Sequence, residues 1–83
     1  MKVNQRDAEG RHHGVWEGYY SNGTVQWRGH YHHGRVHGVW EWYRSDGTLE
    51  WRDHWHHGVK RGLETWWNSQ GRCTRKAYLL VIR

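Results

Sequence analysis

Residues 38–49 read Gly38-Val39-Trp40-Glu41-Trp42-Tyr43-Arg44-Ser45-Asp46-Gly47-Thr48-Leu49, and this stretch decides the fold. A run of aromatic and β-branched residues stops at Asp46-Gly47, and a second such run follows over residues 49–55. Two runs of this composition on either side of an Asp-Gly pair indicate a β-hairpin. The stretch therefore predicts two antiparallel strands joined by a tight turn.

The same pattern occurs three times along the chain. A constant spacing of 24 residues separates the members of two glycine series, which are Gly14, Gly38 and Gly62, and Gly23, Gly47 and Gly71. Because no insertion breaks this register, each block predicts one structural unit that covers the apolar face of its neighbour. We expect an all-β fold and a single domain over residues 1–83. In it, three 24-residue hairpins, at about 14–34, 38–58 and 62–82, form a six-stranded antiparallel meander.

The composition limits the core to aromatic side chains. The 83 residues include eight Trp and five Tyr but no Phe and no Pro. An aromatic side chain buries roughly 150–250 Å², yet a domain this small buries only about 60% of its unfolded surface. We therefore expect a homodimer or a higher homo-oligomer, in which the apolar segment Tyr78-Leu79-Leu80-Val81-Ile82 offers an edge strand for pairing.

The charge and the apolar content predict the compartment and the class of partner. No apolar run approaches the roughly 20 residues that span a bilayer, residues 1–10 lack the hydrophobic stretch of a secretion signal, and Cys73 is the single cysteine. These features predict a cytoplasmic protein with no membrane span. The formal charge of +5, with nine His in addition, favours anionic partners. A basic surface that only aids solubility is the alternative.

The expected turn geometry sorts the side chains onto two faces. If Gly23 takes the left-handed position after a type I turn, Tyr20 faces Thr24, which places Trp16 opposite Arg28. The predicted core face then carries Val15, Glu17, Tyr19, Val25, Trp27 and Tyr31, with Val39, Glu41, Tyr43, Leu49, Trp51 and Trp55 in the second block. The opposite face is aromatic and cationic. It is the predicted partner-binding surface, formed by Trp16, Arg28, His30, His32, Trp40, Trp42, Arg52, His54, His56 and Trp66. Alternatively, the Trp and Arg pairs, among them Trp40 with Arg52, only hold the sheet together.

The block from Gly38 to Gly62 resembles a MORN repeat. It is most similar to the bacterial antitoxin-type variant, in which Gly-x-Trp-x-x-Tyr-x-x-(Asn/Asp)-Gly precedes a later aromatic-x-x-Gly. The resemblance covers residues 10 to about 72, although Glu64 and Trp67 replace the Trp and the Tyr of the pattern in the third block. It implies a hairpin array that binds partners without catalysis. Toxin neutralisation is suggested for the bacterial family, and membrane or protein contacts for MORN proteins generally.

The sequence predicts no enzyme, no metal and no cofactor. It lacks a Ser/His/Asp signature and a phosphate-binding loop, and its acidic residues stand singly. His30 and His32, like His54 and His56, lie two apart and project from one strand face, but two imidazoles do not close a metal site. An acid–base role of His54 or His56 in phosphoester cleavage is the alternative. The remaining histidines flank glycines and are predicted in loops: His12, His13, His33, His37 and His57.

Together these observations predict a non-enzymatic binding or inhibitor protein of a bacterial or phage conflict system. We expect it to be antitoxin-like and to bind a protein partner stoichiometrically. Cations bind phosphate and aromatic rings stack on bases. A sponge for an anionic nucleotide ligand and a nucleic-acid-binding module are therefore the alternatives. Salt separates them, because nucleic-acid affinity falls log-linearly as the salt concentration rises.

Overall fold

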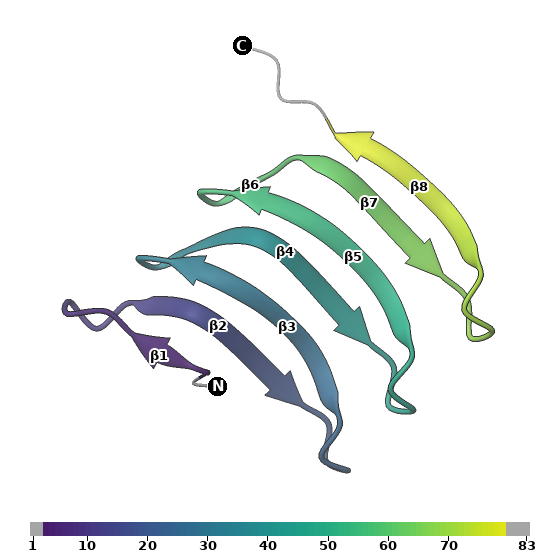
Figure 1. Ribbon diagram of the computed structural model, residues 1–83, viewed down its shortest axis with the longest axis horizontal. Helices are drawn as coiled ribbons and strands as arrows, with labels where there is room; N and C mark the ends of the chain where they lie inside the picture. Colours follow the sequence, from purple (N-terminus) through teal and green to yellow (C-terminus); the bar gives the residue numbers. More distant parts are fainter. Residues whose placement is uncertain (1–2, 80–83) are drawn as a thin grey trace.

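A computed structural model describes residues 3–79, which form one open antiparallel β-sheet (Figure 1). The strands of this part of the chain are β1 (Gln5–Arg6), β2 (His12–Tyr19), β3 (Val25–His32), β4 (Arg35–Tyr43), β5 (Leu49–His56), β6 (Val59–Lys60), β7 (Gly62–Trp67) and β8 (Cys73–Leu79). The spatial order is β1-β2-β3-β4-β5-β7-β8, while β6 pairs with β5. The all-β antiparallel meander is confirmed, with eight strands within residues 3–79 where six were predicted.

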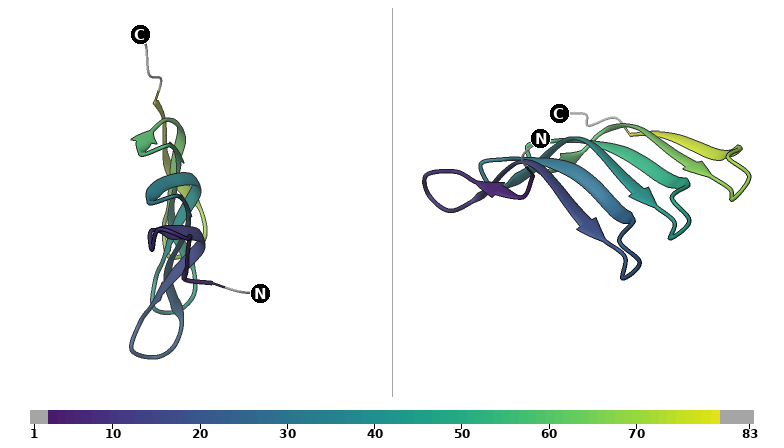
Figure 2. Two further views of the ribbon diagram at one scale, coloured as in Figure 1. Left: turned by 90° about the vertical axis from the view of Figure 1, so that its left-hand side faces the viewer. Right: turned by 60° about the horizontal axis from the view of Figure 1, so that its bottom comes forward.

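The sheet is a single curved layer. Its extents are 42 × 42 × 17 Å, and the side views of Figure 2 show no second layer over either face of residues 3–79. Trp40, at 6% exposure, is the one buried apolar side chain in this part of the chain. The core is therefore shallow, and it is built from aromatic rings that cover one another.

Three similar turns lie at one end of the sheet. Gly23, Gly47 and Gly71 have φ angles of 90°, 91° and 83°, in the left-handed region that glycine adopts without strain. The amide of Tyr20 donates to the carbonyl oxygen of Thr24 at 2.8 Å, and equivalent bonds close the other two turns. The predicted turn glycines and the pairing of Tyr20 with Thr24 are confirmed.

The opposite end carries two tighter turns. His33-Gly34 joins β3 to β4, and His57-Gly58 joins β5 to β6. Both central residues of each turn have positive φ, 46° and 86° in the first and 46° and 85° in the second, which is the type I′ pattern of tight hairpins. His33 and His57 thus lie in turns, as predicted. The loop prediction is wrong for His12, His13 and His37, which lie in β2 and β4. The two-residue turn His33-Gly34 places His37 inside β4, and the connection before β2 ends at Arg11, so His12 and His13 are already paired strand residues.

A one-residue bulge in each hairpin overturns the predicted register. Gly18 pairs with Trp27 but Tyr19 pairs with Val25, so that Gln26 is unmatched. The same shift occurs between Trp42 and Tyr43 and between Trp66 and Trp67. A shift of one residue moves the following side chains to the other face.

The partners across the strands change accordingly. Arg28 lies opposite Glu17 instead of Trp16, and Arg52 lies opposite Glu41 instead of Trp40. The predicted Trp and Arg pairs are therefore wrong. The third predicted hairpin, about 62–82, corresponds to β7 and β8 as far as Leu79, and residues 80–82 of the predicted edge segment lie outside the described residues.

Candidate functional site

One face of the sheet carries a ladder of alternating charges, which we call the charged face. It consists of Glu17, Arg28, Glu41 and Arg52 on four successive strands. Arg28 Nε donates to Glu17 Oε2 at 2.5 Å, and Arg52 Nη2 donates to Glu41 Oε2 at 2.8 Å. The Tyr19 hydroxyl donates to Glu17, and this bond, together with Arg28, lowers the pKa of that carboxyl. Both arginines of the predicted binding surface are thus paired within the sheet.

The other face, which we call the tryptophan face, carries an aromatic strip from β2 to β7. Ring centroids lie 5.4 Å apart for Trp27 and Trp40, 4.5 Å for Trp42 and Trp51, and 6.0 Å for Trp51 and Trp66. Tyr31 connects this strip to Trp16, at 6.1 Å from Trp16 and 5.3 Å from Trp40. The members of the strip are Trp16, Trp27, Tyr31, Trp40, Trp42, Trp51 and Trp66.

The structure divides the residues of the predicted binding surface between the two faces of the sheet. The structure does bring Trp16, Trp40, Trp42 and Trp66 together, but on the face opposite to Arg28 and Arg52. Three predicted core residues join the strip instead, namely Trp27, Tyr31 and Trp51. The bulges cause this rearrangement, because they turn the second strand of each hairpin over relative to the first.

Two of the indole rings pack against a glycine on the neighbouring strand. A Cβ atom on Gly18 would overlap the ring of Trp27, and one on Gly29 would overlap the ring of Trp40. Trp40 Nε1 also donates to the carbonyl oxygen of His30 at 3.0 Å. The ring of Trp40 therefore packs directly on the backbone of β3, which explains its low exposure.

Basic side chains lie over three rings of the tryptophan face. The guanidinium carbon of Arg75 is 4.9 Å from the ring centroid of Trp66, and that of Arg6 is 5.5 Å from Trp16. Lys60 Nζ lies 5.3 Å from the centroid of Trp51. These distances fall within the range of cation–π attraction. An aromatic and cationic surface thus exists, but its cations differ from those predicted.

A buried ionic triad lies beside the aromatic strip, where Lys60 also contacts Trp51. Asp53 is 0% and Glu64 is 7% exposed. Lys60 Nζ lies 3.5 Å from Asp53 Oδ2 and 2.6 Å from Glu64 Oε1, while Trp55 Nε1 donates to Asp53 Oδ1 at 2.8 Å. Desolvation raises the pKa of Asp53, and the contact with Glu64 raises the pKa of Lys60. The triad links β5, β6 and β7.

Sequence reasoning missed this convergence because it treated the acidic residues one by one. The available signal was a pair of departures from the 24-residue register. Glu64 occupies the repeat position that Trp40 has one block earlier, and Asp53 occupies the repeat position that Gly29 has one block earlier. A large ring and the glycine beneath it are thus replaced together by two carboxylates.

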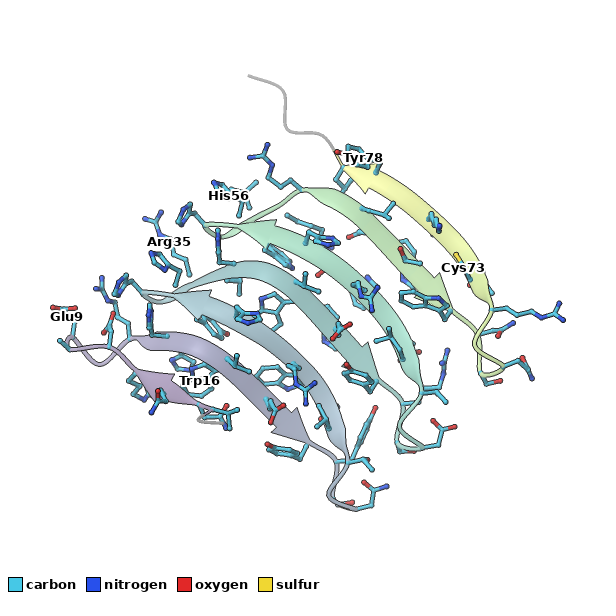
Figure 3. The ribbon with its side chains drawn as sticks, viewed as in Figure 1. Glu9, Trp16, Arg35, His56, Cys73 and Tyr78 are labelled. Atoms are coloured by element: carbon cyan, nitrogen blue, oxygen red, sulfur yellow. The ribbon has the colours of Figure 1, made fainter. Side chains whose placement is uncertain are left out.

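Two histidine clusters lie at the end of the sheet that carries the tight turns. Figure 3 labels His56 and Arg35 at this end. The first cluster is His13, His32 and His33, and the second is His37, His56 and His57. Between the clusters, the ring centroids of His32 and His57 are 5.6 Å apart. Desolvation and neighbouring histidines lower the pKa of His32 and of His57.

The clusters differ from the predicted histidine pairs. His30 and His54 remain outside them, although His30 lines an adjoining open hollow of about 390 Å³. His13 and His37 join them from neighbouring strands, and His33 and His57 join them from the turns. The prediction missed this grouping because it considered residues of one strand and not those across a tight turn.

The fold and its surfaces define an open single-layer β-protein with one aromatic and one charge-paired face. No protein-family model, no curated protein and no solved structure matches this chain. Residues 3–79 contain no helix with the length and apolar character needed to cross a membrane.

Proposed function

We propose that the chain is a non-enzymatic protein that binds a protein partner stoichiometrically through its tryptophan face. The observation that carries this proposal is the continuous aromatic strip from Trp16 to Trp66, with Arg6 and Arg75 stacked on its outer rings. Trp, Tyr and Arg dominate the hot spots of protein interfaces. A strip of this kind on an uncovered face supports a binding role.

The charged face supports this role less well. Its two glutamates and two arginines neutralise one another through short ion pairs. A partner would have to replace these bonds before it gained its own, which costs desolvation. The tryptophan face offers apolar area together with cations that lie over rings, so it can attract an acidic protein surface.

The biological role that we propose is antitoxin-like inhibition within a bacterial or phage conflict system, in the cytoplasm. It rests on the resemblance to the antitoxin-type MORN repeat, and we propose a MORN-like array of three 24-residue hairpins as the architecture. The equal geometry of the three glycine turns supports that repeat. The free, exposed Cys73 suits a reducing compartment.

Trp66 and Trp67 provide a matched pair for the test. They are neighbours in β7, but Trp66 lies under Arg75 on the tryptophan face and Trp67 lies under Arg52 on the charged face. The full chain and the two variants serve as baits in host lysate, and each captured protein is then purified and titrated. We expect a 1:1 complex whose affinity falls by about 30-fold or more with Trp66→Ala, the loss typical of a hot spot. Trp67→Ala should bind normally.

Three results would contradict the proposal. One is equal binding by both variants while circular dichroism shows that they are folded. Another is a partner that is released by nuclease, with a log-linear loss of affinity as salt rises, which would identify a nucleic-acid binder. The third is co-purification of a small anionic ligand in place of a protein, which would identify a nucleotide sponge.

A further inference from the structure

We propose that the two histidine clusters are two binding sites for a divalent transition metal ion of the Zn²⁺ class. The first site consists of His13, His32 and His33, and the second of His37, His56 and His57. This inference is independent of the partner-binding role, since the clusters lie at the tight-turn end of the sheet and apart from the aromatic strip.

The nitrogen atoms of each cluster already converge. In both clusters, one ring nitrogen of each residue lies within 4.8 Å of those of the other two. A tetrahedral Zn²⁺ bonded to imidazole nitrogens at about 2.0–2.1 Å holds them roughly 3.3 Å apart. In each cluster, the histidine of the turn and the histidine of β3 or β5 are exposed. Small rotations of their rings can therefore bring the nitrogen atoms to the separation that zinc requires. Three imidazoles leave a fourth position for water.

The turns hold one histidine of each cluster in an unfavourable conformation. His33 and His57 both have a φ angle of 46°, at a turn position where Asn, Asp or Gly is preferred. Each turn histidine packs against a strand histidine. The rings of His33 and His13 are stacked with centroids 4.5 Å apart, and those of His57 and His37 are tilted with centroids 4.7 Å apart. Strained backbone of this kind, occurring twice with the same geometry, is typical of functional sites.

A carboxylate contacts one of the histidines of the first site. His33 Nδ1 lies 2.6 Å from Asp7 Oδ2, and an Nδ1–H that donates to this carboxylate leaves the lone pair of Nε2 for a metal. Asp7 is itself held by the amides of Glu9 and Arg11 at 3.0 and 2.9 Å. In the described part of the chain, no carboxylate lies in this way against His57. The first site should therefore bind the metal more tightly.

The surroundings favour a metal that prefers nitrogen. Asp7 and Glu9 form another acidic group with His33, but Arg11 already binds both carboxylates at 2.9 Å. Hard cations such as Ca²⁺ and Mg²⁺ require oxygen ligands, whereas imidazole suits Zn²⁺, Cu²⁺ and Ni²⁺. If His13 binds the metal through Nε2, its Nδ1 carries the proton and no longer accepts the hydrogen bond from the His33 amide, which is 3.2 Å long. Water can replace this one long bond.

The experiment titrates the metal-free full chain with Zn²⁺ against a chromophoric chelator and records the visible spectrum with Co²⁺. The wild-type chain should bind two ions per chain with unequal affinities, and the tetrahedral bands of Co²⁺ should appear. The variants His33→Asn and His57→Asn should each bind one ion, and Asn retains the left-handed turn. Asp7→Asn should weaken the tighter site by about 10–100-fold and leave the other unchanged.

The variant His12→Gln is the control, since His12 stacks on Trp16 outside both clusters. It should still bind two ions. The proposal is overturned if wild-type binding is weaker than about 100 µM, if the folded turn variants bind as many ions as the wild type, or if one ion bridges two chains.

Discussion

At the scale of the residue, the position of Trp40 depends on the missing side chain of Gly29. The indole lies on the backbone of β3 where any Cβ atom would overlap it. Gly29 is not one of the glycines with a positive φ angle. This position therefore needs a glycine because of the space that the indole occupies, and not because of backbone freedom. Substitution at this position therefore tests the packing of the tryptophan face separately from turn geometry.

We predict that Gly29→Ala destabilises the protein by about 1–3 kcal/mol, the usual cost of overpacking. Urea unfolding followed by circular dichroism measures the change. The control is the same substitution in a Trp40→Ala background, where the added methyl group should cost much less. Equal costs in the two backgrounds would show that the indole does not occupy this place.

At the scale of the element, the buried triad of Asp53, Lys60 and Glu64 replaces an aromatic contact. The equivalent residues one block earlier are Gly29, Val36 and Trp40. A buried ion pair is often no more stabilising than a well-packed apolar replacement, whereas removal of one partner leaves an unpaired charge. The triad should therefore tolerate complete replacement better than partial replacement.

We predict that Lys60→Ala lowers the free energy of unfolding by about 3 kcal/mol, because it leaves two buried carboxylates. The triple substitution Asp53→Gly, Lys60→Val and Glu64→Trp should be neutral or stabilising, since it restores the packing of the preceding block. Chemical denaturation of both variants measures these values. A triple variant less stable than Lys60→Ala would show that the blocks are not structurally equivalent.

One residue of each histidine cluster, His32 and His57, should make the stability of the sheet depend on pH. The pKa values of His32 and His57 are lowered below 6.5 in the folded state by desolvation and by neighbouring histidines. The unfolded chain then binds more protons than the folded chain, so stability is present above the unfolded pKa and decreases as the pH falls through it.

We predict a lower urea midpoint at about pH 6 than at about pH 7.5, within the range in which histidine titrates. The double variant His32→Gln and His57→Gln should reduce this difference. A urea midpoint that rises on acidification would contradict this assignment of the two lowered pKa values. So would a double variant whose urea midpoint changes with pH as much as that of the wild type.

The hairpins could be predicted from sequence, but the pairing of their faces could not. Asp46-Gly47 and its counterparts mark the turns, because few residues other than glycine adopt positive φ. No residue type marks the bulge at Gln26, although the bulge decides which side chains share a face. The histidine clusters depend in turn on contacts across the tight turns, and a pattern within one strand does not contain these.

At the scale of the whole molecule, a single layer leaves one long edge open. β8 lies at that edge of the described sheet (Figure 1), and Tyr78 is 71% and Leu79 is 37% exposed. The other edge ends in β1, a strand of two residues, which offers little for pairing. Long exposed edges readily pair with another chain.

We predict a homodimer in which β8 pairs with β8 of a second copy across a two-fold axis, so that the two sheets join into one. Tyr78→Lys should weaken the dimer at least about tenfold, because an exposed lysine is a common natural device against edge pairing. Tyr19→Lys is the matched control, since Tyr19 is 50% exposed but lies in β2. Sedimentation equilibrium measures both. A wild-type chain that is monomeric at about 100 µM, or equal association of the two variants, would show that this edge does not join the chains.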